Sequence, residues 1–290
     1  MYKVLLFYKF INIESPEELR DQQKALCDRL GLTGRMIIAH EGINGTFEGT
    51  AEAVEKYKQE LIKDSRFADI VFKESEGNGW AFPKAKIKVR DEIVTLNAGE
   101  FDNATERANE ITAEELHSLY ESDEDFVVLD LRNDYEIKVG AFEKTYDPGL
   151  QNFRDLSEKL DDIKELHGKK IVTVCTGGIR CDKATCLMKK RGFENIYQLK
   201  DGIHNYMEKY PGGHFKGSLF VFDNRMITDV VEVDNKEVIG RCVYCNNLSE
   251  QYYSDDSFRP SRKVICCDNC YQAHKDTLRT VLPEKAAQKV

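Results

Sequence analysis

The stretch KIVTVCTGGIR at residues 170–180 decides the central fold of this chain of 290 residues. Apolar and β-branched residues fill positions 171–174, which is typical of a strand buried on both faces of a parallel sheet. A cysteine and two glycines follow, and residues 183–191 have helical spacing. The stretch therefore predicts an α/β unit whose loop lies at the carboxyl end of a strand, where open α/β sheets place their functional sites.

The loop that begins at Cys175 has the composition of a reactive thiol site. Gly177 and Gly178 allow the backbone angles that turn N–H groups inward, which creates an anion-binding nest. The N-terminus of the following helix and the charge of Arg180 also favour a thiolate over a thiol. We predict that Cys175 is a nucleophile able to hold a persulfide, stabilised by Arg180. The alternative is a buried cysteine beside a glycine turn.

The residues around this loop have the pattern of an α/β domain over 110–212. Strands are predicted at 126–131, 170–174 and 195–198, and helices at 112–120, 153–166, 183–191 and 203–209. A polar stretch at 97–111 has no strong apolar period, so it is predicted to be a linker. Alternating strands and helices of this kind build a parallel sheet covered by helices.

Three further residues near the loop each have two possible roles. Asp130 ends the strand at 126–131 and Arg132 follows two residues later. They form either a charge pair that orients the thiol loop or a surface ion pair worth little. Cys181 either resolves an oxidised Cys175 through a disulfide or simply occupies the first turn of the helix.

The first hundred residues also alternate between strand and helix, but in a different order. Strands are predicted at 3–10, 35–40, 43–48, 67–73 and 84–90, and helices at 15–30 and 50–63. Ser15 and Pro16 mark a helix start, and Gly31 suits its end. The order βαββαβ predicts a ferredoxin-like domain over 1–98, an antiparallel sheet with helices on one face.

Four cations alternate with apolar residues in the strand at 84–90, so they share one face of that strand. They are Lys84, Lys86, Lys88 and Arg90. Such a face can follow an RNA backbone, with Trp80 and Phe82 as stacking surfaces for bases. The alternative is an ordinary solvated strand face.

Five of the nine cysteines lie near the C-terminus, in a Cys-rich module predicted at 213–290. Cys242 and Cys245 form one pair, and Cys267 and Cys270 form another, with Cys266 as an alternate. Two such pairs, about 20 residues apart, are typical of a structural zinc site with four thiolates. The alternative is a set of free or redox-active thiols.

The composition limits the classes of function. The chain has 42 Lys and Arg against 51 Asp and Glu, a formal net charge of −9, so its overall field does not attract nucleic acid. Any RNA contact must therefore come from a local patch. No apolar run reaches the roughly 18–20 residues of a membrane span, and the first residues do not resemble a signal peptide. We expect a cytoplasmic protein.

The motifs CTGGIRC at 175–181 and VLDLRNDYE at 128–136 resemble a rhodanese domain, in which the cysteine at the head of the loop carries a persulfide. More closely, the chain resembles the bacterial family of oxygen-dependent tRNA uridine hydroxylases. That resemblance also rests on EGINGT at 41–46, VRDEIVTL at 89–96, FVFDNRM at 220–226 and the Cys-rich tail. It extends over nearly the whole chain, in order.

The resemblance implies hydroxylation of the wobble uridine of tRNA, uridine 34, to 5-hydroxyuridine, with molecular oxygen as co-substrate. It implies tRNA as a partner and leaves room for a donor of sulfur or electrons. We expect Cys175 to be at the centre of this reaction. Two other functions stay open at this point. One is a rhodanese-like sulfurtransferase that carries a persulfide on Cys175, and the other is a non-catalytic module that binds RNA or protein.

Overall fold

The computed structural model describes residues 1–99, 101–102 and 105–280. They form two compact units, Met1–Asn97 and Ala98–Val290. Within the described ranges, no helix is both long enough and apolar enough to cross a lipid bilayer.

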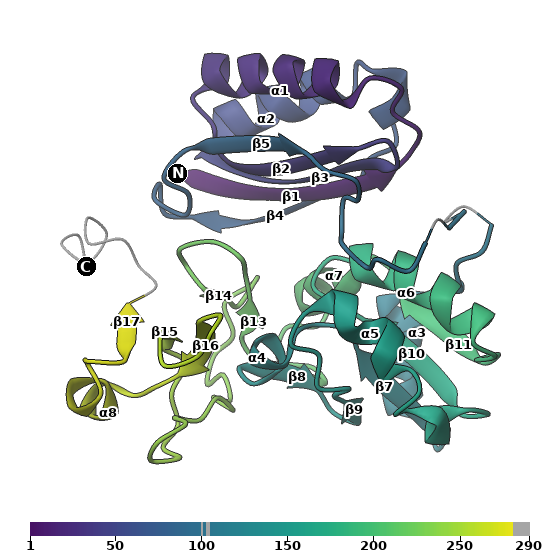
Figure 1. Cartoon of the computed structure of the whole chain (residues 1–290), viewed down its shortest axis with the longest axis vertical. Coiled ribbons are helices and arrows are strands. Elements are labelled where there is room, and N and C mark those ends of the chain that lie inside the picture. Colours follow the sequence, from purple (N-terminus) through teal and green to yellow (C-terminus); the bar gives the residue numbers. More distant parts are fainter. Residues whose placement is uncertain (100, 103–104, 281–290) are drawn as a thin grey trace. The chain divides into compact units, whose positions relative to one another are not determined.

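The first unit is a five-stranded sheet in the order β4-β1-β3-β2-β5, with two helices on one face (Figure 1). Strand β5 runs parallel to β2, and the other neighbouring strands are antiparallel. The elements are β1 (Tyr2–Phe10), α1 (Pro16–Leu30), β2 (Thr33–Ala39), β3 (Gly42–Thr50), α2 (Ala51–Leu61), the 3₁₀ helix η1 (Ser65–Phe67), β4 (Phe72–Gly77) and β5 (Ala85–Val89). The predicted ferredoxin-like sandwich is confirmed, with β5 at one edge.

Aromatic rings fill the space between this sheet and its helices. Phe7 of β1, Phe47 of β3 and Tyr57 of α2 have ring centroids 6.0, 5.7 and 5.2 Å apart. The Tyr57 hydroxyl donates a hydrogen bond to Gln23 Oε1 of α1 at 2.7 Å, so this buried polar group is satisfied. The alternating apolar residues of the strands thus determine which face the helices cover.

The strand predicted at 67–73 is wrong in its position, because β4 begins only at Phe72. Asp64 accepts a hydrogen bond from the backbone N–H of Arg66 at 3.0 Å and begins the short helix η1. This turn places Phe67 in the core, fully buried. A local bond from an Asp side chain to the backbone competes with strand pairing, and here it prevails.

The second unit contains a five-stranded parallel sheet in the order β6-β11-β10-β7-β9. Its elements are β6 (Asn109–Ile111), α3 (Ala113–Tyr120), β7 (Phe126–Asp130), α4 (Asp134–Ile137), β8 (Gly140–Phe142), β9 (Thr145–Tyr146), β10 (Lys170–Val174), α6 (Ile179–Lys190), β11 (Ile196–Leu199) and α7 (Gly202–Lys209). The predicted central α/β domain is confirmed.

Two predicted segments of this unit differ in the structure. The stretch called a linker ends in β6, which pairs with β11 at the sheet edge. The single helix predicted at 153–166 is instead η2 (Phe153–Asp155), α5 (Leu156–Lys159) and η3 (Lys164–Leu166). The apolar residues Leu156, Leu160 and Ile163 are all buried. Separate short helical turns thus bury the same residues whose spacing predicted one continuous helix.

The Cys-rich tail belongs to the same compact unit as the parallel sheet. Its elements are β12 (Phe215–Gly217), β13 (Leu219–Phe220), β14 (Ile227–Thr228), β15 (Tyr252–Asp255), β16 (Arg262–Ile265), α8 (Asp268–Ala273) and β17 (Leu278–Thr280). Strand β12 pairs with β8, and the Tyr252 hydroxyl donates a hydrogen bond to the backbone oxygen of Tyr135. Residues 213–280 therefore pack against the α/β part of the chain.

Candidate functional site

The thiol loop connects the end of β10 to the start of α6, where the sequence predicted it. Cys175 follows the last residue of β10 and is fully buried. Its Sγ accepts a hydrogen bond from the backbone N–H of Gly178 at 3.1 Å. Gly178 has a φ of +103°, a left-handed angle that disfavours residues with a side chain. The glycine is thus needed for the N–H group to point at the sulfur.

The surroundings of Cys175 favour its thiolate. Burial opposes ionisation, but the other contacts outweigh it and lower the pKa of Cys175 to about 6. These contacts are a hydrogen bond from the Cys181 thiol, the charge of Arg180, and the backbone N–H groups of Arg180 and Cys181. The thiolate is therefore the main form at neutral pH, and it is the nucleophilic form of cysteine.

The start of α7 fixes the backbone of the thiol loop. The N–H of Ile203 donates to the carbonyl oxygen of Cys175 at 2.9 Å, and that of His204 donates to Thr176 at 3.0 Å. Gly202 has a φ of +71°, and a Cβ there would lie only 2.6 Å from the oxygen of Cys175. Because the two segments approach so closely, α7 leaves the loop little freedom to change shape.

Arg180 is held by a buried carboxylate that the sequence analysis missed. Its guanidinium donates to both oxygens of Glu136, at 2.6 and 2.9 Å, and to Thr176 Oγ1 at 3.2 Å. The Glu136 side chain is fully buried, and that of Arg180 is nearly so. Arg180 therefore links the loop to α4, and its positive charge interacts with both Glu136 and the thiolate. The only sequence signal was the place of Glu136 in the VLDLRNDYE motif.

Asp130 and Arg132 form a second buried ion pair beneath the first. Arg132 Nη2 lies 2.6 Å from Asp130 Oδ2, and neither side chain has exposed surface. The alternative of a surface ion pair is therefore wrong. Arg132 also donates to the carbonyl oxygens of Gly140 at 2.7 Å and Glu136 at 3.4 Å. The pair thus supports the backbone of the residue that holds Arg180.

Cys181 lies in the first turn of α6 with its thiol against that of Cys175. It is fully buried, and burial together with the neighbouring thiolate raises the pKa of Cys181 well above its ordinary value. Cys181 is therefore a hydrogen-bond donor to the thiolate. Whether it also resolves an oxidised Cys175 stays a prediction.

Four of the five tail cysteines converge. The sulfur atoms of Cys242, Cys245, Cys267 and Cys270 all lie within 4.8 Å of one another, and those of Cys245 and Cys267 are 3.6 Å apart. Cys266 is fully buried and its thiol donates to a backbone oxygen at 3.4 Å, so it is outside the group. This cluster is able to hold a metal ion, and four thiolates are the donor set of structural zinc sites.

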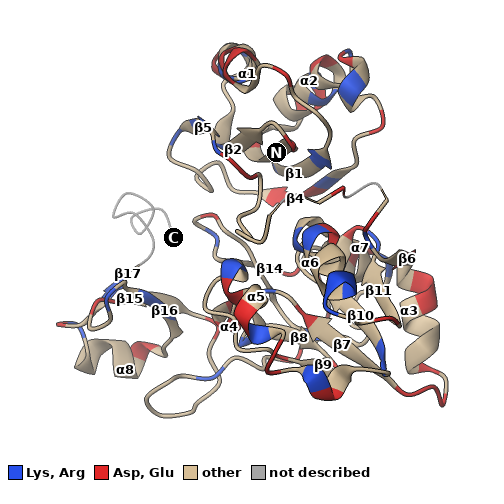
Figure 2. Cartoon of the chain, turned by 45° about the vertical axis from the view of Figure 1, so that its right-hand side comes forward, with Lys and Arg blue, Asp and Glu red and all other residues tan. Residues whose placement is uncertain are grey.

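The predicted basic face lies on β5 and its flanks (Figure 2). Lys84, Lys86 and Arg90 are exposed, and Arg35 of β2 is the register partner of Lys86. Repulsion by the charges of Lys86 and Arg90 lowers the pKa of Lys88, which shows that the cations share one small surface.

Phe82 does not contribute a stacking surface to this face, contrary to the expectation from the sequence. Its side chain is buried in a small cluster with Val4 and Ala81. The Arg35 guanidinium carbon lies 5.4 Å from the centre of the Phe82 ring, within cation–π range. Trp80, the other aromatic residue of the predicted pair, is partly buried.

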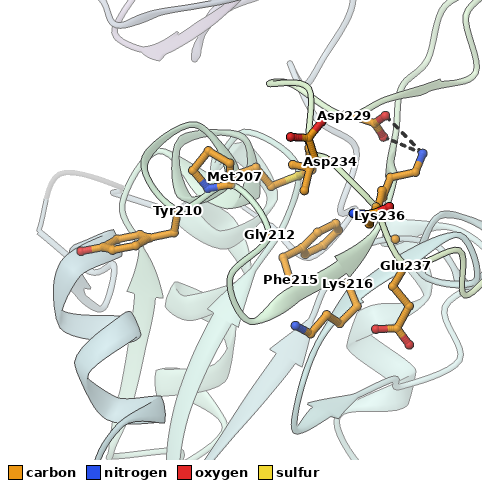
Figure 3. A pocket seen from close by; sticks show the side chains of 13 residues that line it. Met207, Tyr210, Gly212, Phe215, Lys216, Asp229, Asp234, Lys236 and Glu237 are labelled. Atoms are coloured by element: carbon orange, nitrogen blue, oxygen red, sulfur yellow. Dashed lines mark hydrogen bonds and ion pairs between the residues drawn. The ribbon is translucent and has the colours of Figure 1, made fainter.

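A pocket of about 270 Å³ lies at the far end of α7 from the thiol loop (Figure 3). Met207 and Phe215 form part of its apolar lining, and Lys216 and Lys236 contribute charges. Lys236 Nζ donates to Asp229 Oδ1 at 2.9 Å, which holds the 229–237 segment at the pocket wall. Cys175 is not among the lining residues.

Three families match consecutive parts of the chain. Residues 2–93 match the UPF0176 acylphosphatase like domain, residues 112–209 match the Rhodanese-like domain, and residues 216–281 match the family called Rhodanase C-terminal. The first two matches coincide with the α+β sandwich and the parallel sheet. The third contains the cysteine cluster.

The chain is similar over most of its length to several tRNA uridine(34) hydroxylases. That of Cytophaga hutchinsonii is 37% identical over 269 residues, which are 93% of this chain and 86% of the relative. The protein of Bacillus licheniformis is 40% identical over 276 residues, 92% of this chain and 84% of the relative. That of Onion yellows phytoplasma is 37% identical, over 94% of this chain and 89% of the relative. This chain therefore belongs to the tRNA uridine(34) hydroxylase family of enzymes.

Proposed function

We propose that this protein hydroxylates uridine 34 of tRNA at C5, with molecular oxygen as co-substrate and Cys175 as the reacting residue. The observation that carries the proposal is the identity of 37–40% to tRNA uridine(34) hydroxylases over more than nine-tenths of the chain. The site supports it, because the pKa of Cys175 is lowered to about 6. The reactive group is thus a preformed thiolate.

The burial of Cys175 favours a persulfide as its working form. The Sγ atom has no exposed surface, so a large substrate does not reach it directly. A sulfur atom bound to Sγ stands about 2 Å farther out. The Gly178 N–H group and the charge of Arg180 would then stabilise negative charge on the sulfur pair.

The test of this proposal is mass spectrometry of tRNA nucleosides from cells with the wild-type chain, without it, and with Cys175→Ser. We expect 5-hydroxyuridine at position 34 only with the wild-type chain, since serine is nearly isosteric but is not ionised at neutral pH. Cys186→Ser is the matched control, because Cys186 is a buried cysteine of α6, the helix that follows the loop, and donates to the Asp182 backbone oxygen at 3.1 Å. Wild-type modification by Cys175→Ser would contradict the assignment.

We further propose that the basic face of β5 binds the phosphates of tRNA. A chain of net charge −9 needs a local positive surface to attract RNA. Each phosphate contact contributes roughly −0.7 to −0.9 to the slope of log affinity against log salt. Replacing Lys84, Lys86 and Lys88 with Gln should weaken tRNA binding and flatten that slope, while the apolar partners of the strand stay in place. An unchanged slope would leave the residues as an ordinary solvated face.

The four clustered cysteines are proposed to hold one structural zinc ion. Cys242 and Cys245 lie in one turn, whereas Cys267 and Cys270 lie at the start of α8, so the metal would join two segments of a small module. Metal analysis of the protein purified without added metal tests this. About one zinc per chain is expected, and freely alkylated thiols without zinc would contradict it.

A sulfurtransferase is the second candidate, favoured by the match of residues 112–209 to the Rhodanese-like domain. A thiolate at the head of such a loop is suited to accept a sulfur atom. Formation of thiocyanate from thiosulfate and cyanide would reveal this activity. Two results together would favour this function over hydroxylation. One is thiocyanate formation that depends on Cys175, and the other is an unchanged level of 5-hydroxyuridine in cells that lack the protein.

A further inference from the structure

A second group of side chains of metal-ligand type lies at the other end of α7 from the thiol loop. Ligand atoms of His117, Glu121 and His214 are all within 4.8 Å of one another. His117 and Glu121 are four residues apart at the end of α3, so they share one side of the helix. His214 comes from the turn before β12, 93 residues after Glu121. The tertiary structure, not the local sequence, therefore assembles the group.

The His214 ring is oriented from both of its nitrogen atoms. Nδ1 is 2.8 Å from Glu143 Oε2, and Nε2 is 3.0 Å from Glu121 Oε1. Histidines that bind metals usually donate the other ring N–H to a carboxylate, which fixes the tautomer and makes the ligating nitrogen more basic. Glu143 is in the place of that outer carboxylate, and Glu121 is in the place of a neighbouring ligand.

The His117 ring is oriented in the same way by a neutral partner. Its Nδ1 is 2.9 Å from the Tyr206 hydroxyl. The backbone N–H of His214 donates to the same hydroxyl oxygen at 3.3 Å. One tyrosine therefore positions both histidines.

Stacked rings hold the two imidazoles rigidly. His117 lies flat on Tyr210, with ring centroids 4.0 Å apart and an angle of 5° between the planes. His214 stacks on Tyr120 at 4.2 Å and 14°. Ligands that are locked before a metal arrives bind it more strongly than mobile ones, since less conformational freedom is lost.

We propose that His117, Glu121 and His214 bind one divalent ion of a first-row transition metal. With bonds of about 2.1 Å, adjacent ligands of such an ion lie about 3.0–3.4 Å apart, and the His214–Glu121 separation of 3.0 Å already has this value. Two imidazoles and one carboxylate suit zinc or iron(II) and leave coordination positions open for water or another ligand. This site is independent of the function proposed above, because none of its residues contacts Cys175.

Cobalt(II) is the probe, because it distinguishes this site from the tail cysteines. The full chain is first loaded with one equivalent of zinc, which the thiolates bind in preference, and is then titrated with Co²⁺ by absorption spectroscopy and calorimetry. We expect one Co²⁺ per chain with weak bands of nitrogen and oxygen ligands, and without the intense charge-transfer band of cobalt thiolates.

Variants identify the ligands. Glu121→Gln should weaken Co²⁺ binding about tenfold or more, since a ligand is lost. The Glu121 side chain is 66% exposed, so this change leaves the fold intact. His214→Gln should have at least the same effect. His167→Gln is the matched control, because His167 packs on Phe193 at 4.0 Å outside the group and should bind Co²⁺ as the wild type does.

Two results would overturn the proposal. One is a Co²⁺ affinity of Glu121→Gln and His214→Gln equal to that of the wild type. The other is a wild-type chain with one equivalent of zinc that binds no further Co²⁺, which would identify the group as a hydrogen-bonded cluster only. Because the measurement is metal binding, failure here leaves the hydroxylase proposal untouched, and failure of tRNA modification leaves this one untouched.

Discussion

The thiol loop and the tail cluster use the same side chain in opposite surroundings. Cys175 is a single fully buried sulfur whose negative charge is offset by backbone N–H groups and Arg180. In the tail, four sulfurs face one another, and Cys245 is exposed. In the loop, Arg180 and backbone N–H groups offset the negative charge of the thiolate. In the tail, ionised cysteines would instead repel one another. A loop of the first kind stabilises a thiolate, and a cluster of the second kind is able to hold a metal ion.

The largest effect is expected from breaking the ion pair that fixes the loop. Glu136→Ala leaves the Arg180 guanidinium buried without its main partner, which should cost about 3–5 kcal/mol of unfolding free energy. Urea unfolding measures this. The matched control is Glu124→Ala, whose partner Lys170 lies 2.8 Å away at the surface and which should cost under about 1 kcal/mol. Equal costs for the two variants would show that the buried pair does not hold the loop.

The next effect concerns the choice of ligands in the tail. Cys267→Ala removes one sulfur of the cluster and should abolish the bound zinc, whereas Cys266→Ala should keep it, because Cys266 is not one of the four converging cysteines and its thiol donates to the backbone oxygen of Cys267. Zinc content of the two purified variants, with their thermal unfolding, checks this. Loss of zinc from Cys266→Ala alone would reverse the assignment of the ligands.

The smallest effect is a pH dependence that only the thiol loop should produce. The pKa of Cys175 is about 6 in the folded chain and about 8.5 in an unfolded one. A depressed pKa stabilises the fold fully above the unfolded value, and this stabilisation is lost as the pH falls through the folded value. The unfolding free energy should therefore rise between about pH 6 and pH 8.5.

Cys175→Ser should remove that rise from the unfolding free energy measured at several pH values. Cys27→Ser is the control, because burial raises the pKa of Cys27 to about 12 and its thiol does not ionise in this range. If the rise persists in Cys175→Ser, the thiolate of the loop is not its source, and the contrast between the two cysteine regions is weaker than the structure indicates.

Local sequence patterns were sufficient for the main elements of the fold. Apolar runs such as 171–174 predicted buried parallel strands, and the alternation in 84–90 predicted the exposed cations of β5. Both signals arise from the period of one strand, which depends only on neighbouring residues. The position of β4 was missed because of a local hydrogen bond. The Asp64 side chain accepts it from the backbone N–H of Arg66 and starts a short helix, and the spacing of apolar residues does not reveal such a bond.

The sequence by itself determined where the reactive thiol lies, because the strand, the cysteine, the glycines and the arginine are consecutive. Only the tertiary structure decided the partners that come from distant segments. Glu136 meets Arg180 across 44 positions, and no local pattern distinguished it from the other carboxylates. Spacing left Cys266 and Cys267 nearly equivalent, and only the folded chain shows that Cys267 joins the other three converging sulfurs. His117 and Glu121 are neighbours on one helix, but only folding brings His214 to the end of α3. Burial and direction depend on the packing of whole elements, so they are decided only when the chain is folded.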